Sequence, residues 1–135
     1  MTFVLDASAT VPWFLADEAS QTALARLKRV QAEGAIVPSL WHLEVGNVLL
    51  NAQRRGRLSE DALAIARADL PGLRIRVDAE TDQRALNDTF DLAVRFRLTL
   101  YDAAYLELAN RLRLPLATDD QALIKAAQTL GIPLV

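Results

Sequence analysis

Short apolar runs alternate with longer segments of helical period along almost the whole chain, and this alternation constrains the fold more than any other feature. The apolar runs have the length of buried strands, and turn residues or helix caps bound the longer segments. The expected strands are Thr2–Leu5, Ala35–Val37, Leu73–Val77, Leu114–Thr118 and Ile132–Val135. The expected helices are a short one after Ser8 or Thr10, then Ala19–Glu33, Pro38–Arg55, Ser59–Leu70, Thr81–Arg97, Asp102–Leu112 and Gln121–Leu130. This order predicts an α/β fold: a three-layer α/β/α sandwich with a central, mostly parallel sheet, formed by residues 1–135 as one domain.

The composition removes several chemistries. The chain has no cysteine, which excludes disulfides and thiolate sites, and its single histidine excludes a multi-histidine zinc site within one chain. No apolar stretch reaches the ~18 residues of a membrane span. The first residues carry no basic segment, so we expect no signal peptide, no membrane partner and a cytoplasmic protein. The net charge of −2 does not exclude nucleic acid, because the distribution of charge matters more than its sum.

Acidic residues occur at four points where packing alone does not explain them. Asp6 ends the first apolar run, and the pair Asp119–Asp120 follows the run that ends at Thr118. Asp102 opens a helix, and Glu44 lies at the edge of the apolar stripe of another. In parallel sheets, ligands bind beyond the carboxyl ends of the strands, so these acids can converge on one edge. Such a cluster needs a cation, which points to a divalent metal and to metal-assisted phosphate chemistry.

Each acid also has a plainer explanation. Asp102 and one member of the Asp119–Asp120 pair could be helix N-caps, and Glu44 could reach outward to water. Possible supporting residues are Ser8, Asn47, Thr118 and Asp119. Two leucines of the second long helix, Leu43 and Leu50, could serve a dimer or another partner, or could pack on the helix Ala19–Glu33.

Four motifs resemble those of the PIN-domain ribonucleases, and within them the VapC-type toxins of bacterial toxin–antitoxin pairs. The motifs are Val4-Leu5-Asp6-Ala7-Ser8-Ala9, then Pro38-Ser39 followed by Glu44 and Asn47, then Tyr101-Asp102-Ala103-Ala104-Tyr105, and Leu116-Ala117-Thr118-Asp119-Asp120. The third is the most specific, and the resemblance covers nearly the whole chain. The segment Asn110–Leu114 departs from the pattern, because it lacks the glycine often found before the fourth strand.

The resemblance implies a metal-dependent endoribonuclease. The family's functional residues carry over as Asp6, Glu44, Asp102 and Asp120, which would hold Mg²⁺ or Mn²⁺, and Asp119 has no counterpart. It also implies an RNA substrate (tRNA, rRNA or mRNA), a cognate VapB-type antitoxin and a homodimer. In-line attack by water would leave 5′-phosphate and 3′-hydroxyl ends.

Two other interpretations remain open from the sequence. A Mg²⁺-dependent phosphatase of the haloacid-dehalogenase kind also ends its first strand with an aspartate, but it needs a second acid where this chain has Ser8. A catalytically inactive PIN-fold binding module would keep the fold without cleaving RNA.

Overall fold

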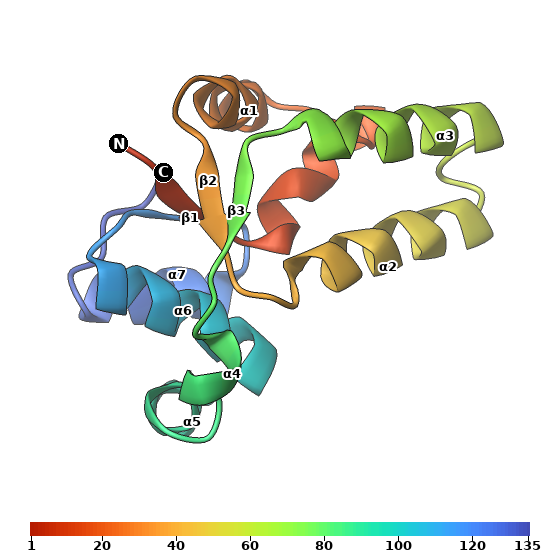
Figure 1. The fold of residues 1–135 in the computed structure, drawn as a ribbon. Helices are drawn as coiled ribbons and strands as arrows, with labels where there is room; N and C mark the ends of the chain where they lie inside the picture. The colour runs from red at the N-terminus through yellow and green to blue at the C-terminus, as the bar shows by residue number, and fades with distance from the viewer.

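The computed structural model describes residues 1–135 and contains a four-stranded parallel sheet of order β3-β2-β1-β4 (Figure 1). Strand β1 (Phe3–Leu5) pairs in parallel with both β2 (Ala35–Val37) and β4 (Leu116–Ala117), and β3 (Ile75–Val77) pairs with β2. The first, second and fourth strands are fully buried, as expected for a parallel sheet covered on both faces. The predicted α/β architecture is confirmed.

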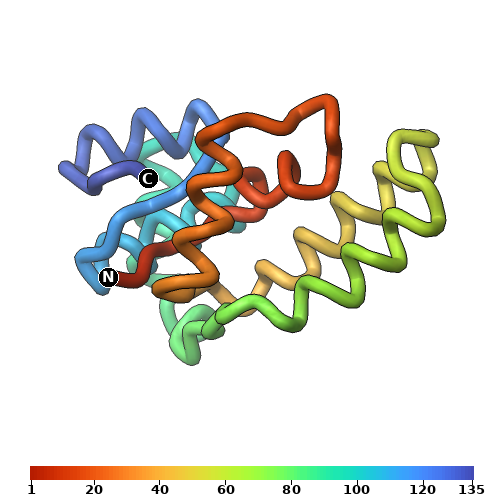
Figure 2. The backbone as a smooth tube through the Cα atoms, turned by 90° about the horizontal axis from the view of Figure 1, so that it is seen from above, coloured from red at the N-terminus to blue at the C-terminus, as the bar shows by residue number.

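Helices flank this sheet on both sides. They are α1 (Gln21–Glu33), α2 (Trp41–Arg54), α3 (Glu60–Asp69), α4 (Thr81–Arg84), α5 (Asp88–Phe96), α6 (Leu100–Leu112) and α7 (Gln121–Thr129). Three short 3₁₀ helices, η1 (Ala7–Trp13), η2 (Ala16–Glu18) and η3 (Leu70–Gly72), complete the chain. Helix α6 packs against β1 with α5 and α7 beside it, and η1 contacts both α1 and α2. Helices α2 and α3 run side by side as a hairpin that extends away from the sheet (Figures 1 and 2). No helix is both long and apolar enough to span a lipid bilayer.

Two predicted elements differ from the structure. The helix expected over Thr81–Arg97 is broken between α4 and α5, because Asn87 lies outside helical backbone angles and its side-chain amide donates to the Gln83 carbonyl. The last predicted strand, Ile132–Val135, is reduced to one parallel bridge between Leu116 and Leu134. The first error concerns a local backbone break that apolar patterns do not encode.

Helix starts and ends also differ in detail from the sequence prediction. Neither Ser8 nor Thr10 caps the first short helix: the Ser8 hydroxyl donates to Asp6, and Thr10 donates to the Ala7 carbonyl. Helix α6 is followed by Arg113, which has a left-handed backbone with φ of 55°. Arginine therefore occupies the left-handed position that glycine commonly takes after a helix.

An ion-pair network joins α6 to the connection between β3 and α4. The guanidinium of Arg111 on α6 lies 2.7 Å from Asp78, 3.0 Å from Glu80 and 2.8 Å from Glu107. Asp78 directly follows β3 and is buried. Hydrogen bonding to Glu107, together with Asp78, raises the pKa of Arg111 further above its usual range. The network therefore anchors α6, the helix that carries Asp102.

Candidate active site

The four predicted acids come from four separate segments around the carboxyl end of the sheet. Asp6 directly follows β1, and Asp119 and Asp120 follow β4, which pairs with β1. Glu44 lies in the first turn of α2 after β2, and Asp102 lies in the first turn of α6. Because β1 is central in the sheet, its carboxyl end is the meeting point for the other three segments.

Asp6 is buried and is held by two hydroxyl groups. The Ser8 hydroxyl donates to Asp6 Oδ2 at 2.6 Å, and the Thr118 hydroxyl donates to the same oxygen at 2.7 Å. The backbone amides of Asp119 and Asp120 in turn donate to the Ser8 and Thr118 hydroxyl oxygens, each at 3.0 Å. The loop after β4 and the segment after β1 are thereby locked together around one carboxylate oxygen.

Glu44 is oriented by a tyrosine from α6. The hydroxyl of Tyr105, a fully buried residue, donates to Glu44 Oε1. Tyr105 lies three residues after Asp102, so one helix supplies both an acid and the side chain that holds a second acid. Burial first, and then the hydrogen bond to Glu44, raise the pKa of Tyr105. The phenol therefore stays protonated and remains a donor.

Asp102 and Asp120 differ in their local roles. Asp102 is not an N-cap: the cap of α6 is Thr99, whose hydroxyl oxygen accepts from the Asp102 backbone amide at 3.1 Å. The capping explanation for Asp102 was therefore wrong. Asp120 does cap α7, because its Oδ2 accepts from the Leu123 amide at 2.9 Å. The cap of α6 fixes the backbone position of Asp102, and the cap of α7 fixes that of Asp120.

Burial, and after it mutual repulsion, raises the pKa of three of the acids. Burial raises the pKa of Asp6, and the charge of Asp120 adds to the effect against the hydrogen bonds from Ser8 and Thr118. Burial likewise raises the pKa of Glu44, with further contributions from Asp6 and Asp102. The pKa of Asp102 is raised by burial and then by the charges of Asp6 and Asp120. The carboxylates therefore share one electrostatic environment.

No basic side chain forms an ion pair with any of these four acids. The hydrogen bonds occupy Asp6 Oδ2, Glu44 Oε1 and Asp120 Oδ2, which leaves the second oxygen of each without a side-chain donor. Hard oxygen donors without a cation are the ligand set that Mg²⁺ and Mn²⁺ prefer. No three acidic or histidine side chains are grouped closely enough to form a coordination sphere as they stand. The donor chemistry fits a divalent ion, and hydrogen bonds hold one oxygen each of Asp6, Glu44 and Asp120, whereas the Asp102 carboxylate has no such bond.

The supporting residues divide into three kinds. Ser8 and Thr118 bond directly to Asp6. Asp119 points its carboxylate at Arg26 of α1, with a distance of 2.7 Å between Arg26 Nη1 and Asp119 Oδ1. Asn47 is exposed and forms no side-chain hydrogen bond, so its supporting role stays a prediction.

Sequence reasoning assigned no role to Tyr105 or Arg26. The signal for Tyr105 was its spacing of three residues from Asp102 on one helix. The signal for Arg26 was its position in the buried stripe of α1, between Ala23 and Val30. Arginine on a buried helix face needs acceptors, and here they belong to the loop after β4.

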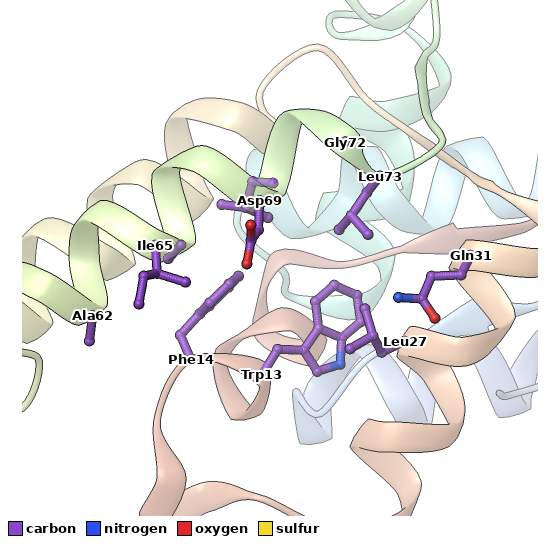
Figure 3. A pocket seen from close by; sticks show the side chains of 11 residues that line it. Trp13, Phe14, Leu27, Gln31, Ala62, Ile65, Asp69, Gly72 and Leu73 are labelled. Atoms are coloured by element: carbon purple, nitrogen blue, oxygen red, sulfur yellow. The ribbon is translucent and has the colours of Figure 1, made fainter.

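A cavity of about 540 Å³ lies apart from the acids, between η1, α1 and α3 (Figure 3). Its walls are mainly apolar, and Figure 3 shows Trp13, Phe14, Leu27 and Ile65 around it. None of the four acids lines it. This cavity is therefore a second surface feature, separate from the acidic edge.

Comparison with known proteins identifies the family to which this fold belongs. The PIN domain family model matches residues 3–128, and the chain belongs to this family. It is similar to Ribonuclease VapC3 of Pyrobaculum aerophilum, with 31% identity over 98% of this chain and 100% of that protein. It is also similar to Ribonuclease VapC1 of Mycobacterium tuberculosis, with 32% identity over 96% of this chain and 92% of that protein. The crystal structure of PAE2754 from Pyrobaculum aerophilum superposes with a TM-score of 0.64 at 26% identity, covering 93% of this chain and 86% of that one. The VapC-type resemblance inferred from the four motifs is thus confirmed.

Proposed function

We propose that this chain is a metal-dependent endoribonuclease toxin that hydrolyses RNA phosphodiester bonds. The observation that carries the proposal is the set of four carboxylates at one sheet edge, with no basic partner and with pKa values raised in three of them. The similarity to proteins named Ribonuclease VapC3 and VapC1 supports RNA as the substrate class. The absence of cysteine and the exposed position of His42 support chemistry that needs neither a thiolate nor an imidazole.

The proposed ligands of the ion are Asp6, Glu44, Asp102 and Asp120. When bound, Mg²⁺ or Mn²⁺ supplies positive charge beside the phosphate and lowers the pKa of water. The protein's own part is orientation. Ser8 and Thr118 fix one oxygen of Asp6, and Tyr105 fixes one oxygen of Glu44. These donors fix the direction of the Asp6 and Glu44 carboxylates, and the four acids would have to move closer together to share one cation.

The cognate partner in this proposal is a VapB-type antitoxin. The support is the apolar cavity between η1, α1 and α3, whose lining suits the apolar face of a helix (Figure 3). Burial, and then the charges of Asp6 and Asp120, raise the pKa of Asp102, so a positive charge placed among these acids would relieve their repulsion. In this proposal an arginine of the antitoxin takes the place of the metal ion among the acids.

A homodimer is part of the same proposal. Leu86, Phe90 and Val94 are exposed and recur every four residues along α5 and the turn before it. Phe90 and Val94 lie four residues apart in α5, which puts these two side chains on one face, and Leu86 lies in the turn before them. Leu43 and Leu50 of α2 are also exposed, which contradicts the alternative that they pack on α1. Exposed apolar stripes of this kind favour self-association.

The test is expression of the wild-type chain, Asp6→Asn and the control Asp61→Asn, followed by growth measurement and sequencing of RNA 5′ ends. Asp61 is an exposed acid in the first turn of α3, in the hairpin that extends away from the sheet (Figure 1), and its side chain forms no hydrogen bond. We expect growth arrest and a small set of new 5′-phosphate ends for the wild type and the control, and neither for Asp6→Asn. With purified protein, EDTA should abolish cleavage and Mg²⁺ or Mn²⁺ should restore it.

Other outcomes distinguish the alternatives. Soluble wild-type protein that causes no arrest and no new ends would indicate an inactive binding module. Hydrolysis of a small phosphate ester without cleavage of RNA would indicate a phosphatase. Cyclic phosphate ends formed in EDTA would contradict the metal-dependent mechanism.

A further inference from the structure

Arg26 is the most buried basic residue of the chain, and the proposed chemistry does not use it. Only 8% of its surface is exposed, although it lies on α1, away from the four acids in sequence. Its guanidinium donates to Asp119 Oδ1 at 2.7 Å and to the Thr118 carbonyl at 3.3 Å. It also donates twice to the Val135 carbonyl, at 3.0 and 2.8 Å. Burying this charge is costly unless hydrogen-bond acceptors surround it. Here the acceptors are oxygen atoms of Thr118 and Asp119, in the loop after β4, and of Val135.

The acceptors of Arg26 connect directly to Asp6. Arg26 holds the carbonyl of Thr118, and the hydroxyl of Thr118 donates to Asp6. Arg26 also holds the side chain of Asp119, and the backbone amide of Asp119 donates to the Ser8 hydroxyl, which in turn donates to Asp6. Two chains of hydrogen bonds therefore run from one guanidinium to the same carboxylate.

We propose that Arg26 and Asp119 form a positioning pair that sets the Thr118–Asp120 loop, and through it the placement of Asp6 and Asp120. The inference deepens the proposed function and rests on it for its catalytic consequence. It assigns a role to the acid that has no counterpart in the family motif: Asp119 faces Arg26 instead of acting as a fifth ligand. The planar fork of arginine suits this task, because it can reach a carboxylate and two carbonyls in fixed directions.

The test compares the wild type with Arg26→Lys, Arg26→Met and Asp119→Asn. The control is Arg29→Met, one turn further along α1, where the arginine is more exposed and pairs with Glu33. Urea unfolding first identifies which variants are folded. Asp119 is 46% exposed at its side chain, so Asp119→Asn is the variant expected to fold even if Arg26→Met does not.

Two readouts separate positioning from a purely structural role. Hydrogen exchange should show faster exchange of the Asp119 and Asp120 amides in Asp119→Asn and in Arg26→Lys, with α2 and α3 unchanged. Titration with Mn²⁺ alone, followed by calorimetry, should show weaker binding by about tenfold for folded Arg26→Met, since loss of an outer partner of a metal site typically costs 10- to 100-fold. Arg26→Lys should not restore wild-type affinity, because lysine keeps the charge and loses the fork.

The results that overturn the inference are specific. Wild-type exchange of the loop amides in Asp119→Asn, or wild-type Mn²⁺ affinity in folded Arg26 variants, would contradict it. Full rescue by Arg26→Lys would show that charge alone is needed. If the wild type itself neither binds Mn²⁺ nor cleaves RNA, the proposed function fails, and the exchange experiment still decides whether the pair positions the loop.

Discussion

Replacing Arg111 with methionine should destabilise the fold strongly, because this side chain connects three acids on two parts of the structure. Methionine keeps the apolar length of the side chain and removes only the charged fork. After the change, Asp78 and Glu107 remain as carboxylates that are 8% and 6% exposed, without their cation. Glu80 is 43% exposed and still has Arg84, so it adds little.

The magnitude follows from burial. Removing one partner of a buried ion pair costs about 3–5 kcal/mol, and each hydrogen bond to a charged group is worth about 1.5–3 kcal/mol. Arg111 itself is 13% exposed, so water can reach the stranded carboxylates and the low end of the range applies. We therefore expect a loss of about 3 kcal/mol in the free energy of unfolding. For a chain of this length the loss corresponds to a decrease in Tm of roughly 10 °C.

The assay is urea unfolding with equal m-values, compared with the matched variant Arg84→Met. Arg84 binds the same Glu80 from the exposed side of the network, so its unfolding midpoint should stay near that of the wild type. A loss of less than about 1 kcal/mol in Arg111→Met would refute the reasoning, because it would mean that the network behaves as a surface ion pair. Equal losses in both variants would refute it as well.

Three further predictions concern the site and its helix. Tyr105→Phe should lower the RNA cleavage rate by about tenfold or more while the core stays packed, since Glu44 loses its donor; steady-state cleavage and urea unfolding check both parts. Asp102→Asn should raise the free energy of unfolding in EDTA at pH 7 by up to about 1 kcal/mol, as expected for a partly exposed charge. The sign follows because the folded-state pKa of Asp102 is raised, so the ionised carboxylate opposes folding above its unfolded pKa; unfolding as a function of pH should show this gain disappearing below about pH 4. Arg113→Gly should stabilise the protein by about 0.5–1 kcal/mol, because glycine adopts the left-handed backbone without strain, and a lower or unchanged Tm would contradict this.

Much of the fold could be predicted from apolar periodicity. The buried strands β1 and β2 and the helices α1, α2 and α3 were located within a few residues, because their patterns match one secondary structure each. The break at Asn87 was missed because it depends on backbone angles and one side-chain bond rather than on hydrophobic pattern. The order of the strands was not predicted, because pairing of β1 with β4 is a long-range contact.

The acids of the candidate site could be predicted, but the residues that hold them could not all be. Charged residues at strand ends are visible in the sequence, and the sheet edge explains why they matter. The hydroxyl of Tyr105 and the guanidinium of Arg26 act across 61 and 93 residues of sequence. Their partners become apparent only when α6 and α1 are packed on the sheet. Long-range orientation is thus the part of the site that a single sequence leaves open.

The central position of β1 has a consequence for the cell that makes this protein. Asp6 is synthesised before the Thr118 hydroxyl that orients it, which comes 112 residues later. Strand β4 and the start of α7 must leave the ribosome before the acids can meet, so a nascent or interrupted chain has no complete site. The proposed site can therefore assemble only after residue 120 has left the ribosome.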